Sequence, residues 1–194
     1  MALLTYYLVY FLIGFVLPSV LVYRHTGINP LRHPTDDTVR GYVEKTLRGN
    51  ALLIPLAVFL DATNSSAHGS FGTITELQQP WLHLLGWFML LLSLVWLLIA
   101  QVNMGSSWRI GIDTKNSTPL VTTGLFKLSR NPIFLAIRVN MVGLFFVTPN
   151  ALTLTITVSC ELLIEIQVRL EEAHLRTLHA ENYTLYAARV RRWL

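Results

Sequence analysis

Three charged residues lie within stretches of sequence that are otherwise apolar. Arg138 interrupts the run 133–148, and Glu161 and Glu165 interrupt the run 151–168. A charge within a membrane segment costs free energy and usually faces a partner charge or a cavity. If the two runs form an antiparallel hairpin, Arg138 falls roughly opposite Glu161, and Glu165 lies one helical turn further along. The spacing therefore predicts an ion pair of Arg138 with one of the two glutamates, lining a substrate cavity.

The residues just before the first of these runs are suited to binding an anion. Asn131 and Pro132 are typical of a helix start, because asparagine can cap a helix and proline fits its first turn. The free N–H groups of a helix N-terminus favour a carboxylate. Arg130 could pair with a carboxylate or a lipid phosphate. The alternative is a purely structural helix start, with its arginine anchored at the membrane surface.

Several familiar ligand sites are missing from the sequence. It has no G-x-G-x-x-G after a strand, no P-loop and no βαβ alternation, which argues against a Rossmann-type nucleotide site. Its six histidines lack the paired spacing of metal ligands, so we expect no metal. The single cysteine, Cys160, excludes an intramolecular disulfide. A nucleotide-like cofactor must therefore be held in some other way.

The elements that carry these residues are predicted to be membrane helices. The chain has 194 residues, of which 53% are hydrophobic and 13% charged, about half the charge of an ordinary soluble domain. This composition argues against a soluble domain and, despite the net charge of +4, against a nucleic-acid-binding tail protein. We predict an all-α integral membrane protein with about five transmembrane helices, at 3–23, about 46–64, 81–102, 133–148 and 151–168.

Lysine and arginine residues alternate between the two ends of these helices. The connections 24–50 and 103–132 hold five and four, the tail after residue 168 holds five, and the segments 61–80 and 148–150 hold none. By the positive-inside rule, the N-terminus lies outside and the C-terminus lies in the cytoplasm. The protein is thus expected to be a multi-pass protein of the cell membrane, or of the endoplasmic reticulum in a eukaryote.

The tail after the fifth helix is amphipathic. It reads as a helix to about His179 and a shorter helix from Asn182 to Arg192. A site between this tail and the connection 103–132 would have lipid on one flank and water on the other. Such a site suits a bulky apolar substrate and a charged co-substrate. We therefore divide the chain into membrane helices at 1–102 and a catalytic region at 103–194.

The sequence TPLVTTGLFKLSRNPIFL at 118–135 resembles the cofactor motif of the isoprenylcysteine carboxyl methyltransferase family, L-V-x-x-G-[VLIP]-[YF]-x-x-x-R-H-P-x-[YF]-x-G. The matching residues are Leu120, Val121, Gly124, Leu125, Phe126, Arg130, Pro132 and Phe134. Two further family features follow in order, the pair Glu171-Glu172 and a tail that keeps Tyr183, Tyr186, Val190, Arg192 and Trp193. Asn131 departs from the family's common histidine, Ala136 from a glycine and Arg191 from a proline.

The resemblance implies a multi-pass membrane enzyme, here of prokaryotic or archaeal type, that binds S-adenosyl-L-methionine and methylates the carboxylate of a C-terminal prenylated cysteine. Apolar residues of the motif would enclose the adenine. The glutamates would accept hydrogen bonds from the ribose hydroxyls or the ammonium group, and Glu171 matches the family position better. The cofactor-binding residues implied are Thr118, Pro119, Leu120, Val121, Gly124, Phe126, Arg130, Asn131, Pro132, Ile133, Phe134, Glu171 and Glu172.

The chemistry implied is direct displacement of the methyl group. A prenylcysteine or other lipidic carboxylate is ionised at neutral pH and needs no general base. The rate would come from alignment of the carboxylate oxygen, methyl carbon and sulfur, and from a dry site. We expect Arg138 or Arg169 to orient this carboxylate, with Glu165 completing the catalytic group.

Three alternatives remain open from the sequence. A phospholipid amine N-methyltransferase would have to remove a proton from nitrogen, so its pH profile would show an activity-linked pKa. An NADPH-dependent sterol-type reductase resembles this C-terminal region but is longer. A membrane scaffold or channel would bind neither S-adenosylhomocysteine nor NADPH. Cofactor binding therefore separates these classes.

Overall fold

The computed structural model describes residues 1–27, 37–63, 72–108 and 119–194. Its long elements are helices, as the composition predicts. The first is continuous through α1 (Ala2–Phe11), a π-helical segment (Leu12–Val16) and α2 (Leu17–Thr26), and it is followed by α3 (Val39–Thr63), α5 (Pro80–Met104), α6 (Pro132–Val147) and α7 (Ala151–Arg189). Short 3₁₀ turns occupy Thr75–Leu77, Gly105–Ser107 and Gly124–Lys127.

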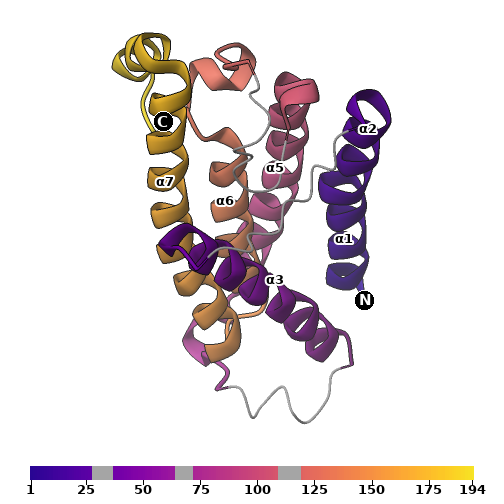
Figure 1. Ribbon diagram of the computed structural model, residues 1–194. Coiled ribbons are helices and arrows are strands. Elements are labelled where there is room, and N and C mark those ends of the chain that lie inside the picture. Colours follow the sequence, from indigo (N-terminus) through magenta and orange to yellow (C-terminus); the bar gives the residue numbers. More distant parts are fainter. Residues whose placement is uncertain (28–36, 64–71, 109–118) are drawn as a thin grey trace.

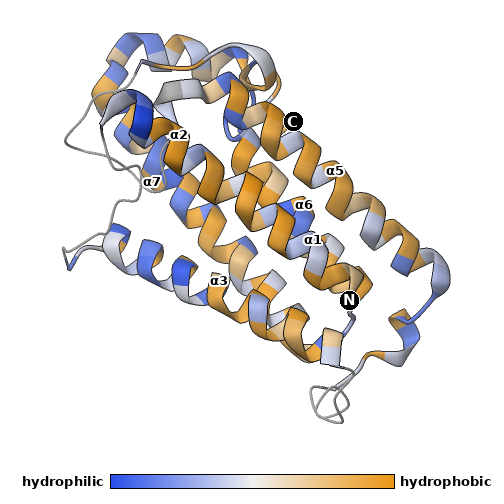
Figure 2. Ribbon diagram, turned by 90° about the vertical axis from the view of Figure 1, so that its right-hand side faces the viewer, coloured by the Kyte–Doolittle hydropathy of each residue, from blue (hydrophilic) through white to orange (hydrophobic). Residues whose placement is uncertain are grey.

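The helices pack as a closed ring. Helix α5 packs on α6, α6 on α7, α7 on α3 and α3 on α1, and the π-helical segment returns to α5. In Figure 1, α1, α5, α6 and α7 stand side by side, and α3 crosses them obliquely. Hydrophilic residues gather at one end of the bundle, around the first half of α3 and the second half of α7 (Figure 2). That end carries most of the described charged residues.

Three helices are long and apolar enough to cross a membrane, by length and composition: Ala2–Thr26, Pro80–Met104 and Ala151–Arg189. The protein is a multi-pass integral membrane protein, and the predicted first, third and fifth spans are confirmed as helices. Pro132–Val147 is apolar but has only 16 residues. The second predicted span, 46–64, proves to be the end of a longer helix, 39–63. Arg48, Asn50 and Asp61 lie inside the predicted span and lower its hydropathy, and this helix is not among those apolar enough to cross a membrane.

Pro18 shapes the first helix. A proline has no N–H, so the carbonyl of Gly14 four residues earlier loses its helical donor. The chain widens into the π-helical segment just before Pro18, and the side-chain amide of Gln101 from α5 donates to the Gly14 carbonyl instead. The irregularity before Pro18 is therefore a π-helical turn whose freed carbonyl ties the first helix to α5.

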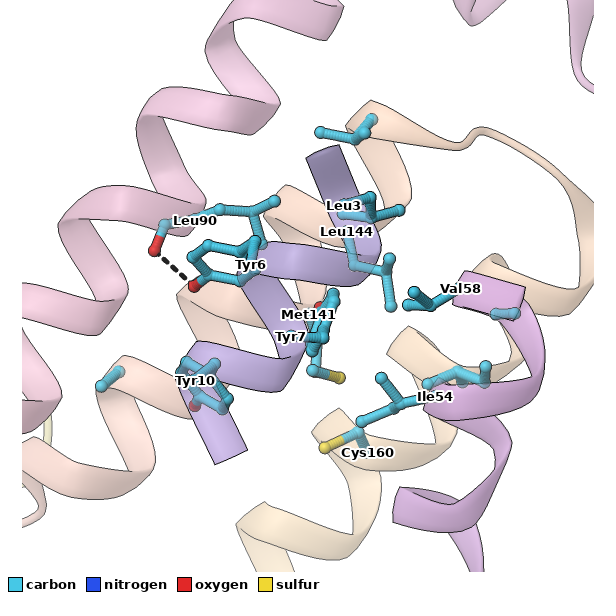
Figure 3. Close-up of a cluster of buried hydrophobic side chains, with 14 of the residues drawn as sticks. Leu3, Tyr6, Tyr7, Tyr10, Ile54, Val58, Leu90, Met141, Leu144 and Cys160 are labelled. Atoms are coloured by element: carbon cyan, nitrogen blue, oxygen red, sulfur yellow. Dashed lines mark hydrogen bonds between the residues drawn. The ribbon is translucent and has the colours of Figure 1, made fainter. Parts of the chain in front are cut away.

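A polar network lies inside the ring. Asn140 of α6 is fully buried; its side-chain amide donates to the hydroxyls of Tyr6 at 2.7 Å and Ser93 at 2.9 Å, and Tyr7 donates to its oxygen at 3.0 Å. The Tyr6 hydroxyl in turn donates to the carbonyl of Leu90, as Figure 3 shows. Such buried polar groups join α1, α5 and α6 in one register, because moving any helix would leave a partner unsatisfied.

Two glycines bring α5 and α6 close together. A Cβ on Gly86 would lie 2.9 Å from the carbonyl oxygen of Gly143 and from the backbone nitrogen of Val147. A Cβ on Gly143 would lie 3.0 Å from the Gly86 carbonyl. The absence of side chains at this crossing therefore sets the spacing of the helices that carry the site.

The α6–α7 hairpin forms where the sequence predicts it. Its turn spans 148–150, and Asn150 and Thr153 cap α7 with reciprocal hydrogen bonds. The chain bends sharply at Ala180, where φ is +43°, so the tail is two helical pieces as predicted. After Arg189 the chain turns back, and its C-terminus lies beside α7 rather than beyond it (Figure 1).

Candidate functional site

Glu172 is the centre of the polar end of the bundle. Its side chain is buried on α7, just before the bend. Arg130 donates to both of its oxygens, with Nη2 3.0 Å from Oε1 and 3.1 Å from Oε2. Arg192 also binds both, at 3.1 Å from Nε and 2.9 Å from Nη2. The Asn131 amide completes the set at 3.1 Å. We call these four residues the Glu172 hub.

The hub ties the C-terminal segment to the start of α6. The backbone N–H of Arg130 donates to the carbonyl of Arg191 at 3.0 Å, and its Nη1 donates to the carbonyls of Ala187 and Val190, both at 2.9 Å. Ser129 donates to the carbonyl of Arg192 at 3.1 Å. Hydrogen bonding to Glu172 raises the pKa of Arg192, so this arginine stays charged. Three chain segments thus converge on one carboxylate.

The predicted intramembrane ion pair is present. Nη2 of Arg138 lies 2.6 Å from Oε2 of Glu161, and its Nη1 lies 3.9 Å from Glu165. Arg169 pairs with Glu165 at 2.7 Å, one helical turn away. The ring of Trp193 covers the guanidinium of Arg138, 4.2 Å from it. The candidate catalytic residues Arg138, Glu165 and Arg169 are therefore neighbours, and their catalytic roles remain predictions.

The two adjacent glutamates point in different directions. Glu172 faces the hub, whereas Glu171, which matches the family motif better, lies near Glu44 of α3. The oxygens of Glu172 already accept hydrogen bonds from three side chains, which leaves little capacity for ribose hydroxyls. In this arrangement Glu172 holds the site together, and cofactor binding by either glutamate remains a prediction.

The motif loop is described from Pro119 onward, so Thr118 lies outside the described residues. Pro119 is exposed, and Leu120 and Val121 are half-buried. Gly124 has φ +61°, and a Cβ there would lie 2.1 Å from the side-chain oxygen of Asn103. This position therefore requires glycine because of local packing, whatever its relation to a cofactor.

The start of α6 differs from the predicted capping. Asn131 occupies the N-cap position but makes no capping bond with its side chain, which points to Glu172 and the Arg192 carbonyl. Pro132 is buried, and its carbonyl accepts from Trp96 at 3.1 Å. Ile133 and Phe134 pack against the core. The first turn of α6 therefore has N–H groups that its N-cap side chain does not occupy.

One further residue belongs to the candidate site, although its motif alone did not indicate a role. Tyr183 is 1% exposed, and its hydroxyl has no hydrogen-bond partner among the described residues. Glu172 and Arg130 are close enough for their charges to act on it. Neighbouring Tyr186 instead donates to the carbonyl of Phe126 at 2.7 Å. An unpaired buried hydroxyl fits a site that receives a polar ligand.

A metal site and a cavity are the other two features that could mark a functional site. No group of three or more potential metal ligands occurs among the residues that the structure describes. A cavity of about 430 Å³, lined by residues such as Asp61, Gln78 and His83, lies at the α6–α7 turn, the opposite end of α6 from the hub. The arginine and asparagine side chains at the hub are donors that can orient an anionic or hydrogen-bonding ligand.

Comparison with known proteins bears on this site. A family profile described as "Phospholipid methyltransferase" matches residues 81–182, just over half of the chain. The matched part contains nearly all of α5, the motif loop, α6 and most of α7 with Glu172. This family is related to the isoprenylcysteine methyltransferase type of membrane enzyme. No curated protein matches the chain. The chain belongs to the phospholipid methyltransferase family.

Proposed function

We propose that this protein transfers a methyl group from S-adenosyl-L-methionine to the amine of a membrane phospholipid, at the end of the bundle that holds the Glu172 hub. It is a membrane methyltransferase of a family that uses S-adenosyl-L-methionine. Membership of this family favours methylation of a lipid amine over methylation of a prenylcysteine carboxylate and over NADPH-dependent reduction. The positive-inside rule supports a cytoplasmic location for this end.

The observation that carries the proposal is the hub itself. The segment just before α6 and the C-terminal segment are far apart in sequence, yet both bond to Glu172 of α7. These are the segments in which the methyltransferase motifs lie. Charged hydrogen bonds between distant segments fix the positions of these side chains before a ligand binds, and catalysis by alignment requires such fixed positions.

Residues of the motif loop, the start of α6 and the tail suit the parts of the cofactor. Half-buried Leu120, Val121 and Phe134 offer apolar surface for the adenine, and the Tyr183 hydroxyl offers an unused hydrogen bond. The start of α6 favours a carboxylate. When bound, S-adenosyl-L-methionine supplies an electrophilic methyl group. The chain's residues then have to hold the acceptor in line with it and exclude water.

A lipid-borne carboxylate remains the second candidate acceptor. The C-terminal motifs resemble those of carboxyl methyltransferases, and arginines outnumber glutamates around Arg138. The two acceptors make different demands. An ammonium group must release a proton before its nitrogen attacks the methyl carbon, whereas a carboxylate is already nucleophilic. An amine acceptor therefore predicts a rate that rises with pH to a plateau.

The test is methyl transfer from radiolabelled S-adenosyl-L-methionine by purified protein, with phosphatidylethanolamine and N-acetyl-farnesylcysteine supplied separately. We expect label in phosphatidylethanolamine, with a rate that increases between pH 6 and pH 9, about the range in which amines approach deprotonation. Label only in the farnesylcysteine, at a rate independent of pH in that range, would show that the methyl acceptor is a carboxylate and not an amine. No transfer to either lipid, although S-adenosylhomocysteine binds, would reject both acceptors.

A further inference from the structure

The charges around Glu165 do not balance. Three arginines, Arg138, Arg169 and Arg192, surround two glutamates, Glu161 and Glu165. Glu172 binds Arg192 but also Arg130, so adding Glu172 and Arg130 to the count gives four arginines and three glutamates. An excess positive charge beside apolar helices is costly unless a polar ligand or an anion meets it.

Two of these arginines use only one side of their guanidinium groups. Arg138 directs Nε and Nη2 at Glu161, and Arg192 directs Nε and Nη2 at Glu172. Their Nη1 groups lie 3.9 Å and 3.8 Å from the two oxygens of Glu165, too far for hydrogen bonds. No described residue accepts a hydrogen bond from either Nη1 group. Two sets of unused donors therefore converge on the same point from α6 and from the C-terminal segment.

The group is accessible to a ligand. Side chains of Arg138, Glu161, Glu165 and Arg192 are 27% to 34% exposed, and Arg169 is 60% exposed. The carboxylate of Glu165 makes its short contact only with Arg169, so it can move aside without breaking the hub. Leu162 and Ile166, which follow the two glutamates in the sequence of α7, are exposed and offer apolar surface for acyl chains.

We propose that Arg138 and Arg192, with Arg169 at the rim, form a seat for the phosphate group of the lipid acceptor, and that Glu165 is the internal counter-ion which the phosphate displaces. We call Arg138, Glu161, Glu165, Arg169 and Arg192 the headgroup seat. Two guanidinium groups can each donate to one of the two free oxygens of a phosphodiester. Trp193 holds Arg138 in place by covering its guanidinium face. This inference rests on the proposed function, since it assumes a lipid-borne acceptor.

The direction in which Glu165→Gln changes the affinity for a phosphate-bearing lipid tests the headgroup seat. Glu165→Gln removes the counter-ion without changing the size of the side chain, so affinity for a phosphate-bearing lipid should rise. We expect the Kd of dihexanoyl-phosphatidylethanolamine, measured by isothermal titration in detergent, to fall about threefold or more. Dihexanoylglycerol, which lacks the phosphate, should show no such gain. Glu76→Gln, at an exposed site outside the seat, is the control for loss of one negative charge.

A second variant tests the donors directly. The double substitution Arg138→Gln with Glu161→Gln removes a whole ion pair and leaves the net charge unchanged. We expect it to raise the Kd of dihexanoyl-phosphatidylethanolamine about threefold or more while S-adenosylhomocysteine still binds. The bound S-adenosylhomocysteine also reports that each variant is folded.

Several outcomes would overturn the seat. An unchanged or weaker affinity of Glu165→Gln for dihexanoyl-phosphatidylethanolamine contradicts Glu165 as a displaced counter-ion. A change in S-adenosylhomocysteine affinity alone would assign the anion site to the cofactor's carboxylate. A gain restricted to N-acetyl-farnesylcysteine would assign it to a lipid carboxylate. If wild-type protein fails to bind S-adenosylhomocysteine, the proposed function fails, whereas the lipid titration still decides the seat.

Discussion

At the scale of single residues, two neighbouring glutamates show how a helix separates roles. Glu171 and Glu172 are adjacent in sequence, but a helix turns by about 100° per residue, so they face different partners. Glu172 meets Arg130, Arg192 and Asn131, and Glu171 lies near Glu44. A motif that ends in two glutamates therefore combines a structural carboxylate with one that is free of the hub.

Glu172→Gln should destabilise the protein much more than Glu171→Gln. The first change leaves the guanidinium groups of Arg130 and Arg192 without their carboxylate, a loss of about 3 kcal/mol for a buried pair. The second leaves the hub intact and is its matched control. The apparent midpoint of thermal unfolding in detergent measures both. Equal midpoints for the two variants would show that the hub is not what fastens the tail.

Tyr183→Phe should weaken cofactor binding without loosening the fold. Its hydroxyl is buried and lacks a described partner, so its removal breaks no hydrogen bond within the part of the chain that the structure describes. We expect the Kd of S-adenosylhomocysteine to increase about fivefold, as for one lost hydrogen bond. Tyr186→Phe is the contrasting variant, because it loses the bond to Phe126 and should lower the unfolding midpoint instead. An unchanged Kd for Tyr183→Phe would remove this residue from the cofactor site.

At the scale of elements, the site depends on how closely α5, α6 and α7 pack. The Gly86–Gly143 crossing sets the distance between α5 and α6, and the capped turn at 148–150 fixes α7 against α6. The hydrophobic runs and the turn signal predict these helices and their hairpin. They do not predict that α3 begins at Val39, because its charged first half has no apolar periodicity that marks a membrane span.

Gly86→Ala should destabilise the bundle by about 1–3 kcal/mol, because its Cβ meets backbone atoms of α6 that cannot move independently. Gly49→Ala in α3 is the control, since a Cβ there has no neighbour within 4 Å and alanine favours a helix. The unfolding midpoint should fall for the first variant and stay or rise for the second. A fall of the same size in both would indicate a general effect of losing glycine.

At the scale of the whole molecule, contacts within the α6–α7 hairpin can be predicted from the sequence, whereas contacts made by the C-terminal segment cannot. The sequence predicts an ion pair of Arg138 with Glu161 or Glu165, because these charges lie in apolar runs at matching depths of a hairpin, and the structure shows that the short contact is to Glu161. It also predicts the bend near Ala180. It cannot predict the hub, since that requires the C-terminal segment to turn back and place Arg192 beside Arg130. Nor can spacing show which of two adjacent glutamates faces inward.

The alternation of positive charge makes a topology prediction. In a Cys160→Ser background, a cysteine at Glu76 should react with a membrane-impermeant maleimide in intact cells, and a cysteine at Lys127 should react only after the membrane is opened. Both positions are exposed, so access depends on the side of the membrane alone. The reverse pattern would place the C-terminus and the hub outside the cell.

The most direct test of the central claim is the binding of S-adenosylhomocysteine to the purified protein, measured by isothermal titration beside NADPH. We expect saturable binding of S-adenosylhomocysteine, no binding of NADPH, and a higher Kd of S-adenosylhomocysteine for Tyr183→Phe. Binding of NADPH alone would contradict this expectation in favour of a reductase. Binding of neither ligand by folded protein would leave the Glu172 hub as a structural brace in a membrane protein that is not a methyltransferase.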